Sequence, residues 1–331
     1  MAGKRKFDEQ IAALEALREQ RHDGGSEDRR AEPLRNALGG KNNFVAAKAA
    51  DLIREFRLTA LTPDLLAAFD HYFENPEKSD PQCWAKNALS HALAAFEHQD
   101  AEVFLRGMRH IQLEPVWGGT SDTAGTLRAT CALALVQCRA VSEADLLKHL
   151  VDLLGDTDKA VRAEVVRAIE QVGSNAASLL LRLRATLGKD EAEVLGACYG
   201  GVLRIEGRSA IPWVSHFLKA HDDTAAEAAL AIAATRSPEA FEVLKGSLNP
   251  WLIDPWFRSV VLSAIALTRQ PGAVEFLLEL VANDSRDAES AIEAILRSMP
   301  SEEVIERLEK HVAGNPRLAR IYKANRNASR S

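Results

Sequence analysis

The feature of this sequence that most constrains its fold is a pair of short amphipathic helices that recurs along the chain. Its clearest copy runs from Val141 to Gly173. Ser142 can cap the first helix, and the turn Asp156–Asp158 can cap the second. Apolar residues follow at helical spacing in both halves, namely Leu146, Leu147, Leu150, Val151 and Leu154, then Val161, Val165, Val166, Ile169 and Val172. Two such helices cannot bury both apolar stripes alone, whereas copies stacked side by side can.

A charged pair recurs together with these helices. An Asp or Asn lies near the turn inside a pair, and a Lys or Arg follows six residues later on the second helix. The copies are Asn42 and Lys48, Asp80 and Lys86, Asp122 and Arg128, and Asp156 and Arg162. They are 38, 42 and 34 residues apart, which is a spacing typical of helical repeats. The pattern stops in the second half of the chain, where Gly196 and Ala228 lie six residues after Asp190 and Asp222.

The segment from Asp156 to Arg162 (DTDKAVR), with the helix that continues to Gly173, resembles the HEAT-repeat family. It is also similar to the HEAT-like repeats of phycobilisome lyases, in repeat type rather than in active site. The resemblance implies that the recurring polar side chains form a structural ladder between neighbouring repeats. The members predicted for this ladder are Asn42, Lys48, Asp80, Asp122, Asp156 and Arg162. The functional alternative is that exposed cations, held in a row by the ladder, bind phosphate or carboxylate groups.

We therefore predict an all-α fold, an α-α superhelix (HEAT-repeat solenoid) of about eight helix pairs with terminal capping helices. The predicted pairs span 27–57, 62–98, 100–139, 142–173, 174–206, 208–236, 237–269 and 271–298. Three regions follow from this, namely an N-terminal capping helix and linker at 1–25, the solenoid at 26–300, and C-terminal capping helices with a basic tail at 301–331. Aromatic residues make up only 6% of the chain, and the alternation typical of half-buried strands is almost absent, so no sheet is predicted.

Motifs and composition weigh against catalysis and membrane insertion. The sequence has no Walker loop, GxGxxG, HExxH or GxSxG motif, so we predict a protein that is not an enzyme and uses no cofactor. His91 and His98 are two helical turns apart, which is too far for both to bind one metal ion. The 4 cysteines show no CxxC spacing and are expected to be reduced, buried thiols. With no apolar run of about 18–20 residues, the protein is expected to be cytoplasmic.

Two other function classes stay open. HEAT-like DNA-glycosylases of the alkylation-repeat type hold a duplex on basic helices, but this chain has a formal net charge of −6. Its one clearly basic run is the C-terminal tail, with Arg317, Arg320, Lys323, Arg326 and Arg330. A HEAT-like, lyase-related enzyme would need a polar pocket that contains an acid or base of perturbed pKa.

Four of the 5 tryptophans lie at or beside turns inside repeats, in segments that are longer than a helix turn requires. These segments are 75–84, the Gly/Pro-rich loop 113–122, and 248–256. Insertions in a helical repeat array project from one edge, and Trp and Arg often dominate the energy of an interface. The partner-binding candidates are therefore Trp84, Lys86, Trp117, Arg128, Trp251, Trp256 and Arg258.

The favoured function is a non-enzymatic protein–protein interaction scaffold or adaptor, whose concave face and Trp-bearing loops bind a protein or peptide. Under the alternative interpretation, the long loops fold back and bury their own tryptophans over helix ends. Substitution of Trp117 or Trp256 separates the two, because binding tryptophans are dispensable for stability and packed ones are not. Nucleic acid and membrane partners are not expected.

Overall fold

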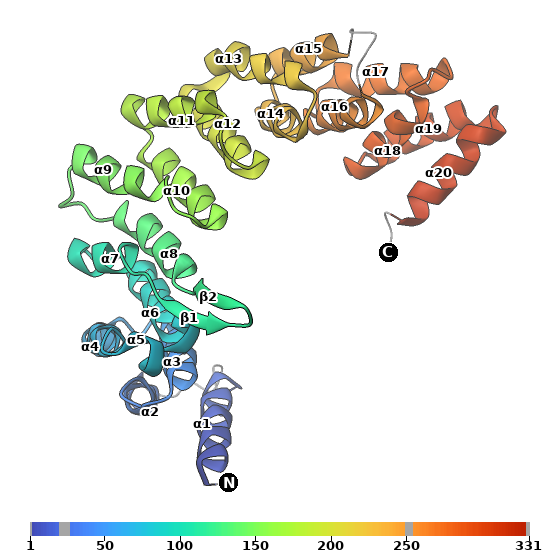
Figure 1. The fold of residues 1–331 in the computed structure, drawn as a ribbon. Coiled ribbons are helices and arrows are strands. Elements are labelled where there is room, and N and C mark those ends of the chain that lie inside the picture. Colours follow the sequence, from blue (N-terminus) through green and yellow to red (C-terminus); the bar gives the residue numbers. More distant parts are fainter. Residues whose placement is uncertain (1, 20–26, 249–253, 329–331) are drawn as a thin grey trace. The chain divides into compact units, whose positions relative to one another are not determined.

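The computed structural model describes residues 2–19, 27–248 and 254–328. These residues form helices almost throughout, which confirms the predicted all-α fold class. They divide into two compact units, Met1–Val172 and Gly173–Ser331, and the boundary lies inside the predicted 26–300 region. Within each unit, successive helix pairs stack side by side (Figure 1).

The described part of the first unit contains four helix pairs that follow an N-terminal helix. Its elements are α1 (Ala2–Glu19), α2 (Glu27–Leu38), α3 (Asn43–Phe56), α4 (Thr62–Tyr72), the short α5 (Pro76–Ser79), α6 (Trp84–Ala95), α7 (Ala101–Met108), β1 (Leu113–Val116), β2 (Gly119–Asp122), α8 (Gly125–Leu135), α9 (Glu143–Leu153) and α10 (Lys159–Val172). The second helices of the pairs, α3, α6, α8 and α10, pack one on the next. Helix α1 packs on α2 and α3, where the capping helix was predicted. The predicted linker falls mostly on residues 20–26, outside the described ranges.

The second unit continues with the remaining predicted pairs. Its helices are α11 (Asn175–Leu187), α12 (Ala192–Glu206), α13 (Ile211–Ser215), α14 (Asp223–Ala234), α15 (Pro238–Ser247), α16 (Pro255–Leu267), α17 (Pro271–Ala282), α18 (Ala288–Arg297), α19 (Glu302–Ala313) and α20 (Pro316–Ala328). Helices α12, α14, α16, α18 and α20 again pack one on the next. Helix α20 contains the basic run as far as Arg326, whereas Arg330 lies outside the described residues.

Helix starts follow capping residues in the sequence. Asn42 caps α3 because its side-chain oxygen accepts the N–H groups of Phe44 and Val45 at 3.0 and 3.1 Å. Ser142 caps α9 in the same way, accepting the N–H of Asp145 at 3.2 Å and donating its hydroxyl to that carboxylate at 2.7 Å. Each cap satisfies N–H groups that have no partner inside the helix, so it specifies where the helix begins.

Small residues let the two helices of a pair approach closely. Gly107 of α7 faces Cys131 of α8, and a Cβ built on Gly107 would overlap the Cys131 Sγ. Cys131 is fully buried, and this burial raises the pKa of its thiol. The thiol therefore stays protonated and serves as a small apolar group in the core.

One segment departs from the all-helical prediction. The loop predicted at 113–122 is a two-stranded antiparallel hairpin, in which β1 and β2 pair and Trp117 and Gly118 form the turn. Gly118 has a φ of +90°, a backbone conformation that L side chains rarely adopt. The hairpin has no buried face of its own, so its sequence lacks the alternation by which a strand is usually recognised.

Replacement of Gly107 by Ala is expected to lower the free energy of unfolding by about 1–3 kcal/mol, because the added methyl group overlaps Cys131 in a filled core. The variant Gly107→Ala/Cys131→Ala will be more stable than the two single losses predict when they are added. Gly246→Ala is the control, since a Cβ there meets nothing within 4 Å and Ala favours a helix over Gly by about 1 kcal/mol. Chemical denaturation of the four variants measures these values, and additive losses at 107 and 131 would contradict the contact.

Candidate functional site

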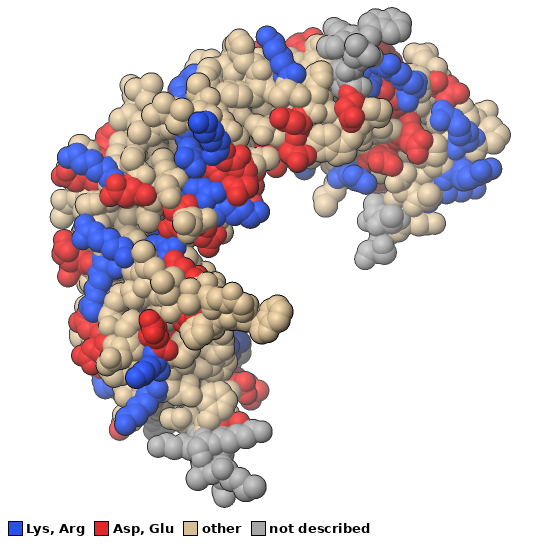
Figure 2. All heavy atoms as spheres, viewed as in Figure 1, with Lys and Arg blue, Asp and Glu red and all other residues tan. Residues whose placement is uncertain are grey.

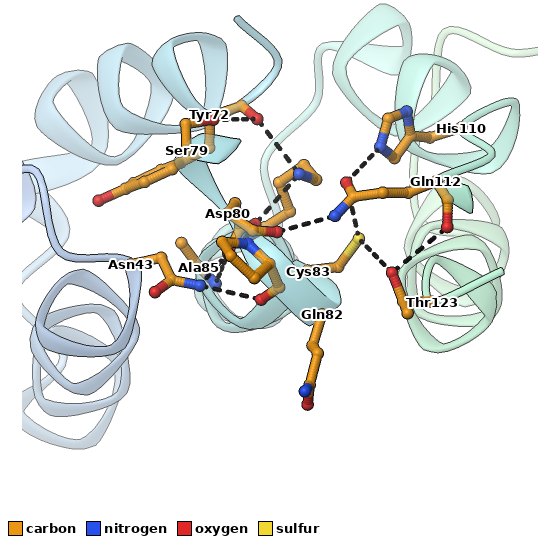
Figure 3. A network of polar contacts seen from close by, with 12 residues as sticks. Asn43, Tyr72, Ser79, Asp80, Gln82, Cys83, Ala85, His110, Gln112 and Thr123 are labelled. Atoms are coloured by element: carbon orange, nitrogen blue, oxygen red, sulfur yellow. Dashed lines mark hydrogen bonds and ion pairs between the residues drawn. The ribbon is translucent and has the colours of Figure 1, made fainter. Parts of the chain in front are cut away.

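A buried ion pair organises the start of α6 (Figure 3). The Asp80 carboxylate accepts the N–H groups of Ala85 and Lys86 at 2.9 and 3.0 Å and the side-chain amide of Asn43 at 2.9 Å. The Lys86 Nζ lies 3.1 Å from the same carboxylate and donates to the Tyr72 carbonyl at 3.2 Å. Both charged side chains are fully buried, so each compensates the charge that the other brings into the core.

The prediction that Lys86 binds a partner therefore does not hold. Trp84, two residues earlier on α6, is 45% exposed, and two steps along a helix turn the side chain by about 200°. The two side chains thus point to opposite faces and cannot present an aromatic–cation pair on one surface. Asp80 does bind the preceding repeat, as the ladder required, but its partner there is Asn43 rather than Asn42.

The same network attaches the base of the hairpin to α6. The Gln112 amide donates to the Asp80 carbonyl at 2.8 Å and to the Glu114 carboxylate at 2.6 Å. Glu114 also accepts the N–H of Gln82 at 2.6 Å and the hydroxyl of Thr123 at 2.8 Å. Burial opposes the ionisation of Glu114, but the hydrogen bonds from Gln112, Gln82 and Thr123 outweigh it and lower its pKa. The hairpin is therefore held at its base by a charged, hydrogen-bonded carboxylate.

Two titratable groups beside Gln112 are held in their neutral forms. The buried Cys83 thiol donates to the Gln112 side-chain oxygen at 3.3 Å, and burial raises its pKa to about 11. A thiol with that pKa is protonated at neutral pH and is a poor nucleophile. His110 lies 3.1 Å from the same oxygen, and burial lowers the pKa of its ring. Both groups therefore join the network without adding charge to it.

Arg128 of α8 connects two neighbouring repeats. Its guanidinium donates two hydrogen bonds to Asp156 at 2.7 and 3.0 Å, one to Asp122 at 2.6 Å and one to the His110 carbonyl at 2.9 Å. Arg128 is buried, which opposes its charge, but the hydrogen bonds to Asp156 and Asp122 raise its pKa. Asp122 and Asp156 thus lie as a ladder between repeats places them, and Arg128 has no exposed charge for the partner that was predicted to bind it.

The remaining predicted members of the ladder have separate roles. Asn42 caps α3, whereas the Lys48 ammonium is exposed and lies 5.5 Å from the centre of the Phe44 ring. Arg162 donates to the carbonyls of Asp156 and Thr157 at 2.6 and 3.1 Å. A spacing of six residues therefore marks polar side chains near one turn, but it does not specify which of them pair.

Arg258 of α16 repeats the geometry of Arg128 in the second unit. It donates two hydrogen bonds to the Asp287 carboxylate, both at 2.6 Å, and one to the Leu248 carbonyl at 2.8 Å. The prediction that Arg258 binds a partner is therefore corrected, because its charge is compensated inside the protein. Asp287 was missed because the search looked six residues before each cation, whereas it follows Arg258 by 29 residues, much as Asp156 follows Arg128 by 28.

The tryptophans differ in how far they are packed. Trp84 contacts the Phe44 ring edge-on at 5.3 Å and is 45% exposed, and Trp256 on α16 is 48% exposed. Trp117, at the hairpin turn, is fully exposed. The alternative in which the loops bury their own tryptophans is therefore wrong for Trp117. Trp251 lies outside the described residues.

A cleft of about 570 Å³ lies beside the hairpin in the first unit. Its apolar lining comes from α7, from the segment that leads into β1, and from the end of α9, and consists of Leu105, Met108, Ile111, Leu113 and Leu153. The ion pairs of Arg128 with Asp122 and Asp156 form one wall, and Arg109, His149 and Asp152 complete the lining. The cleft therefore combines an apolar surface with charged groups at its border.

The hairpin extends this apolar surface beyond the cleft. Ile111, Leu113, Val116 and Trp117 are all exposed, and residues 115–121 contain no Lys, Arg, Asp or Glu. Figure 2 shows the hairpin accordingly as an uncharged projection. Apart from Trp117, the sequence patterns did not single out these residues. The available signal was a pair of aliphatic residues, Ile111 and Leu113, between a helix and a Gly/Pro-rich segment.

Searches for chemistry and for relatives add the following. Among the described residues, no group of three or more His, Cys, Asp or Glu side chains could hold a metal ion. In the same part of the chain, no helix combines the length and the apolar character needed to cross a bilayer. No protein-family model matches the sequence, and no curated protein matches it either.

Arg128→Met is expected to lower the free energy of unfolding by about 3–5 kcal/mol, because it leaves the carboxylates of Asp122 and Asp156 close together without a cation. Arg167→Met is the matched control, since Arg167 forms an exposed ion pair with Glu164 within α10, and such pairs contribute about 0–1 kcal/mol. Urea denaturation of both variants measures the difference. Equal, small losses would show that the Arg128 ladder is not needed for stability.

Stability is expected to fall in acid because of Asp122. Burial opposes its ionisation, but hydrogen bonds from the N–H groups of Ala124 and Gln112 and from Arg128 lower its pKa in the folded protein. A lowered pKa stabilises the fold above the unfolded value of about 3.9, and this stabilisation is lost as the pH falls through the folded value. Asp122→Asn should therefore be less stable than wild type near pH 7 and show a flatter decline below about pH 4. Parallel profiles in pH-dependent urea denaturation would contradict this assignment.

Proposed function

We propose that this chain is a non-enzymatic scaffold that binds a partner protein through the cleft and the hairpin of its first unit. The observation that supports this function is the exposed apolar row of Ile111, Leu113, Val116 and Trp117 beside a cleft of about 570 Å³. Contiguous apolar surface next to a recess, bordered by charged groups, is typical of binding sites.

Burial of these side chains would supply the driving force for binding. Each large apolar side chain that a partner covers contributes about 1.5–3 kcal/mol. Trp117 makes no packing contact that a partner would have to replace, because it is fully exposed in the free protein. The base of the hairpin is already held by Glu114 and Gln112, so binding requires little additional ordering of the backbone there.

We also infer that the helix pairs are HEAT repeats and that the protein works in the cytoplasm. Support for the first inference comes from two buried ion pairs that join consecutive repeats, Arg128 with Asp156 and Arg258 with Asp287. They link equivalent positions of helix pairs in both units at nearly equal sequence separations of 28 and 29 residues. The second inference rests on the sequence features alone.

Affinity capture from a lysate of the source cells, read by quantitative mass spectrometry, tests the scaffold function. Leu113→Asn and Trp117→Ala should each reduce capture of one discrete protein by about tenfold, a loss of about 1.4 kcal/mol. Both side chains are exposed, so the free energy of unfolding should stay within about 0.5 kcal/mol of wild type.

Leu187→Asn is the matched control, because Leu187 on α11 is 58% exposed, against 53% for Leu113, and does not line the cleft. Capture should survive this change. The function is contradicted if all three variants lose the protein equally or if none does. Recovery of nucleic acid in place of a protein would favour the alkylation-repeat alternative.

A further inference from the structure

Strand β2 has one edge whose main-chain groups are open. The N–H of Thr123 donates to the Gln112 carbonyl at 2.9 Å, which marks these two residues as a hydrogen-bonded pair. Such pairs alternate along an antiparallel ladder with pairs that make no mutual bond. The register places Pro115 opposite Thr120, and the alternation makes this a pair of the second kind. The N–H and C=O of Thr120 therefore point away from β1.

The two edges of the hairpin differ in their protection. At the outward position of β1 lies Pro115, which has no N–H and cannot donate to an added strand. The equivalent position of β2 is Thr120, which keeps its N–H. Its neighbours Gly119 and Ser121 are exposed and uncharged. Proline, lysine and inward charges are the usual protection of an exposed edge, and β2 has none of them between Gly119 and Ser121.

One face of the hairpin borders the cleft. Leu113 and Asp122 are directly opposite each other, and both line the cleft. Because side chains alternate along a strand, Pro115 and Thr120 share that face. Glu114 lies on the other face, where its carboxylate joins the network at the base of the hairpin. A strand added to β2 would continue the alternation, so every second side chain would lie on the cleft side.

The charges in the cleft lining narrow the chemistry of such a strand. Arg109 and Asp152 are both exposed and both line the cleft. No ion pair within the described residues engages either of these two side chains. Arg128, by contrast, is compensated by Asp122 and Asp156. The complementary ligand is therefore apolar at its centre, with an acidic group toward Arg109 and a basic group toward Asp152.

We propose that β2 binds an extended segment of a partner protein as a third strand of the hairpin. The main chain of Thr120 sets the register of this segment, and apolar side chains at alternate positions enter the cleft. An acidic and a basic residue flank the apolar ones. This inference rests on the proposed function and adds the conformation and chemistry of the bound segment.

A phage-displayed library of random 12-residue peptides, selected on the full chain, provides the probe. Selected peptides are synthesised with a fluorescent label, and their dissociation constants are measured by anisotropy. Thr120→Pro removes the outward N–H at a position where an edge strand tolerates proline, and it should weaken binding at least tenfold. Thr120→Val keeps the N–H and should bind within about twofold of wild type.

A scan of the peptide itself avoids any dependence on how the variants fold. Methylation of one peptide nitrogen at a time should abolish binding at alternate positions and have little effect between them, because only every second N–H faces β2. Charge reversal at Arg109 or Asp152 should select peptides with the opposite charge at one flank.

The outcomes separate this inference from the function on which it rests. Peptides that bind, lose affinity with Leu113→Asn, yet show no alternation on methylation and no difference between Thr120→Pro and Thr120→Val, overturn the added strand and leave the cleft as a binding site. A library that yields no peptide dependent on Leu113 or Thr120 overturns both. A chain that associates with itself through Thr120, seen by analytical ultracentrifugation, identifies a second copy as the occupant and overturns the heterologous partner.

Discussion

The guanidinium of Arg128 lies between the carboxylates of Asp122 and Asp156, and through them it joins the end of the hairpin to the turn of the next repeat. A cation at that depth is tolerated only because two anions and a carbonyl surround it. Arg258 and Asp287 solve the same problem in the second unit. Stacking of the repeats in each unit thus depends on charges that are buried where successive pairs meet.

The hairpin takes its place from this ladder and from the network around Asp80. Asp122 ends β2 at the ladder, whereas Glu114 of β1 and Gln112 just before it bind the network next to α6. Both ends of the insertion are therefore attached to packed helices, and its turn is left in solvent. An exposed, uncharged projection held firmly at its base presents apolar groups without a large loss of entropy on binding, which is why the proposed partner site lies there.

Part of the candidate site was legible from sequence, because Trp117 lies in an insertion of unusual composition. The cations paired with tryptophans were not. Lys86 and Arg258 follow Trp84 and Trp256 by two residues, but two steps on a helix reverse the direction of a side chain, and both cations are compensated by aspartates inside the protein. The cleft itself was also missed, since its lining joins residues of α7, β1 and α9 that no local pattern connects.

The sequence by itself determined the helices, their pairing and most of their boundaries, because capping side chains and apolar stripes at helical spacing act over one or two turns. It also marked the polar residues that gather near each turn. Only the tertiary structure decided which of those residues pair, that 113–122 forms a hairpin, and that the hairpin borders an apolar cleft. These features depend on contacts between residues about 30 positions apart, such as Arg128 with Asp156 and Gln112 with Asp80, and such distances are set by how the repeats pack.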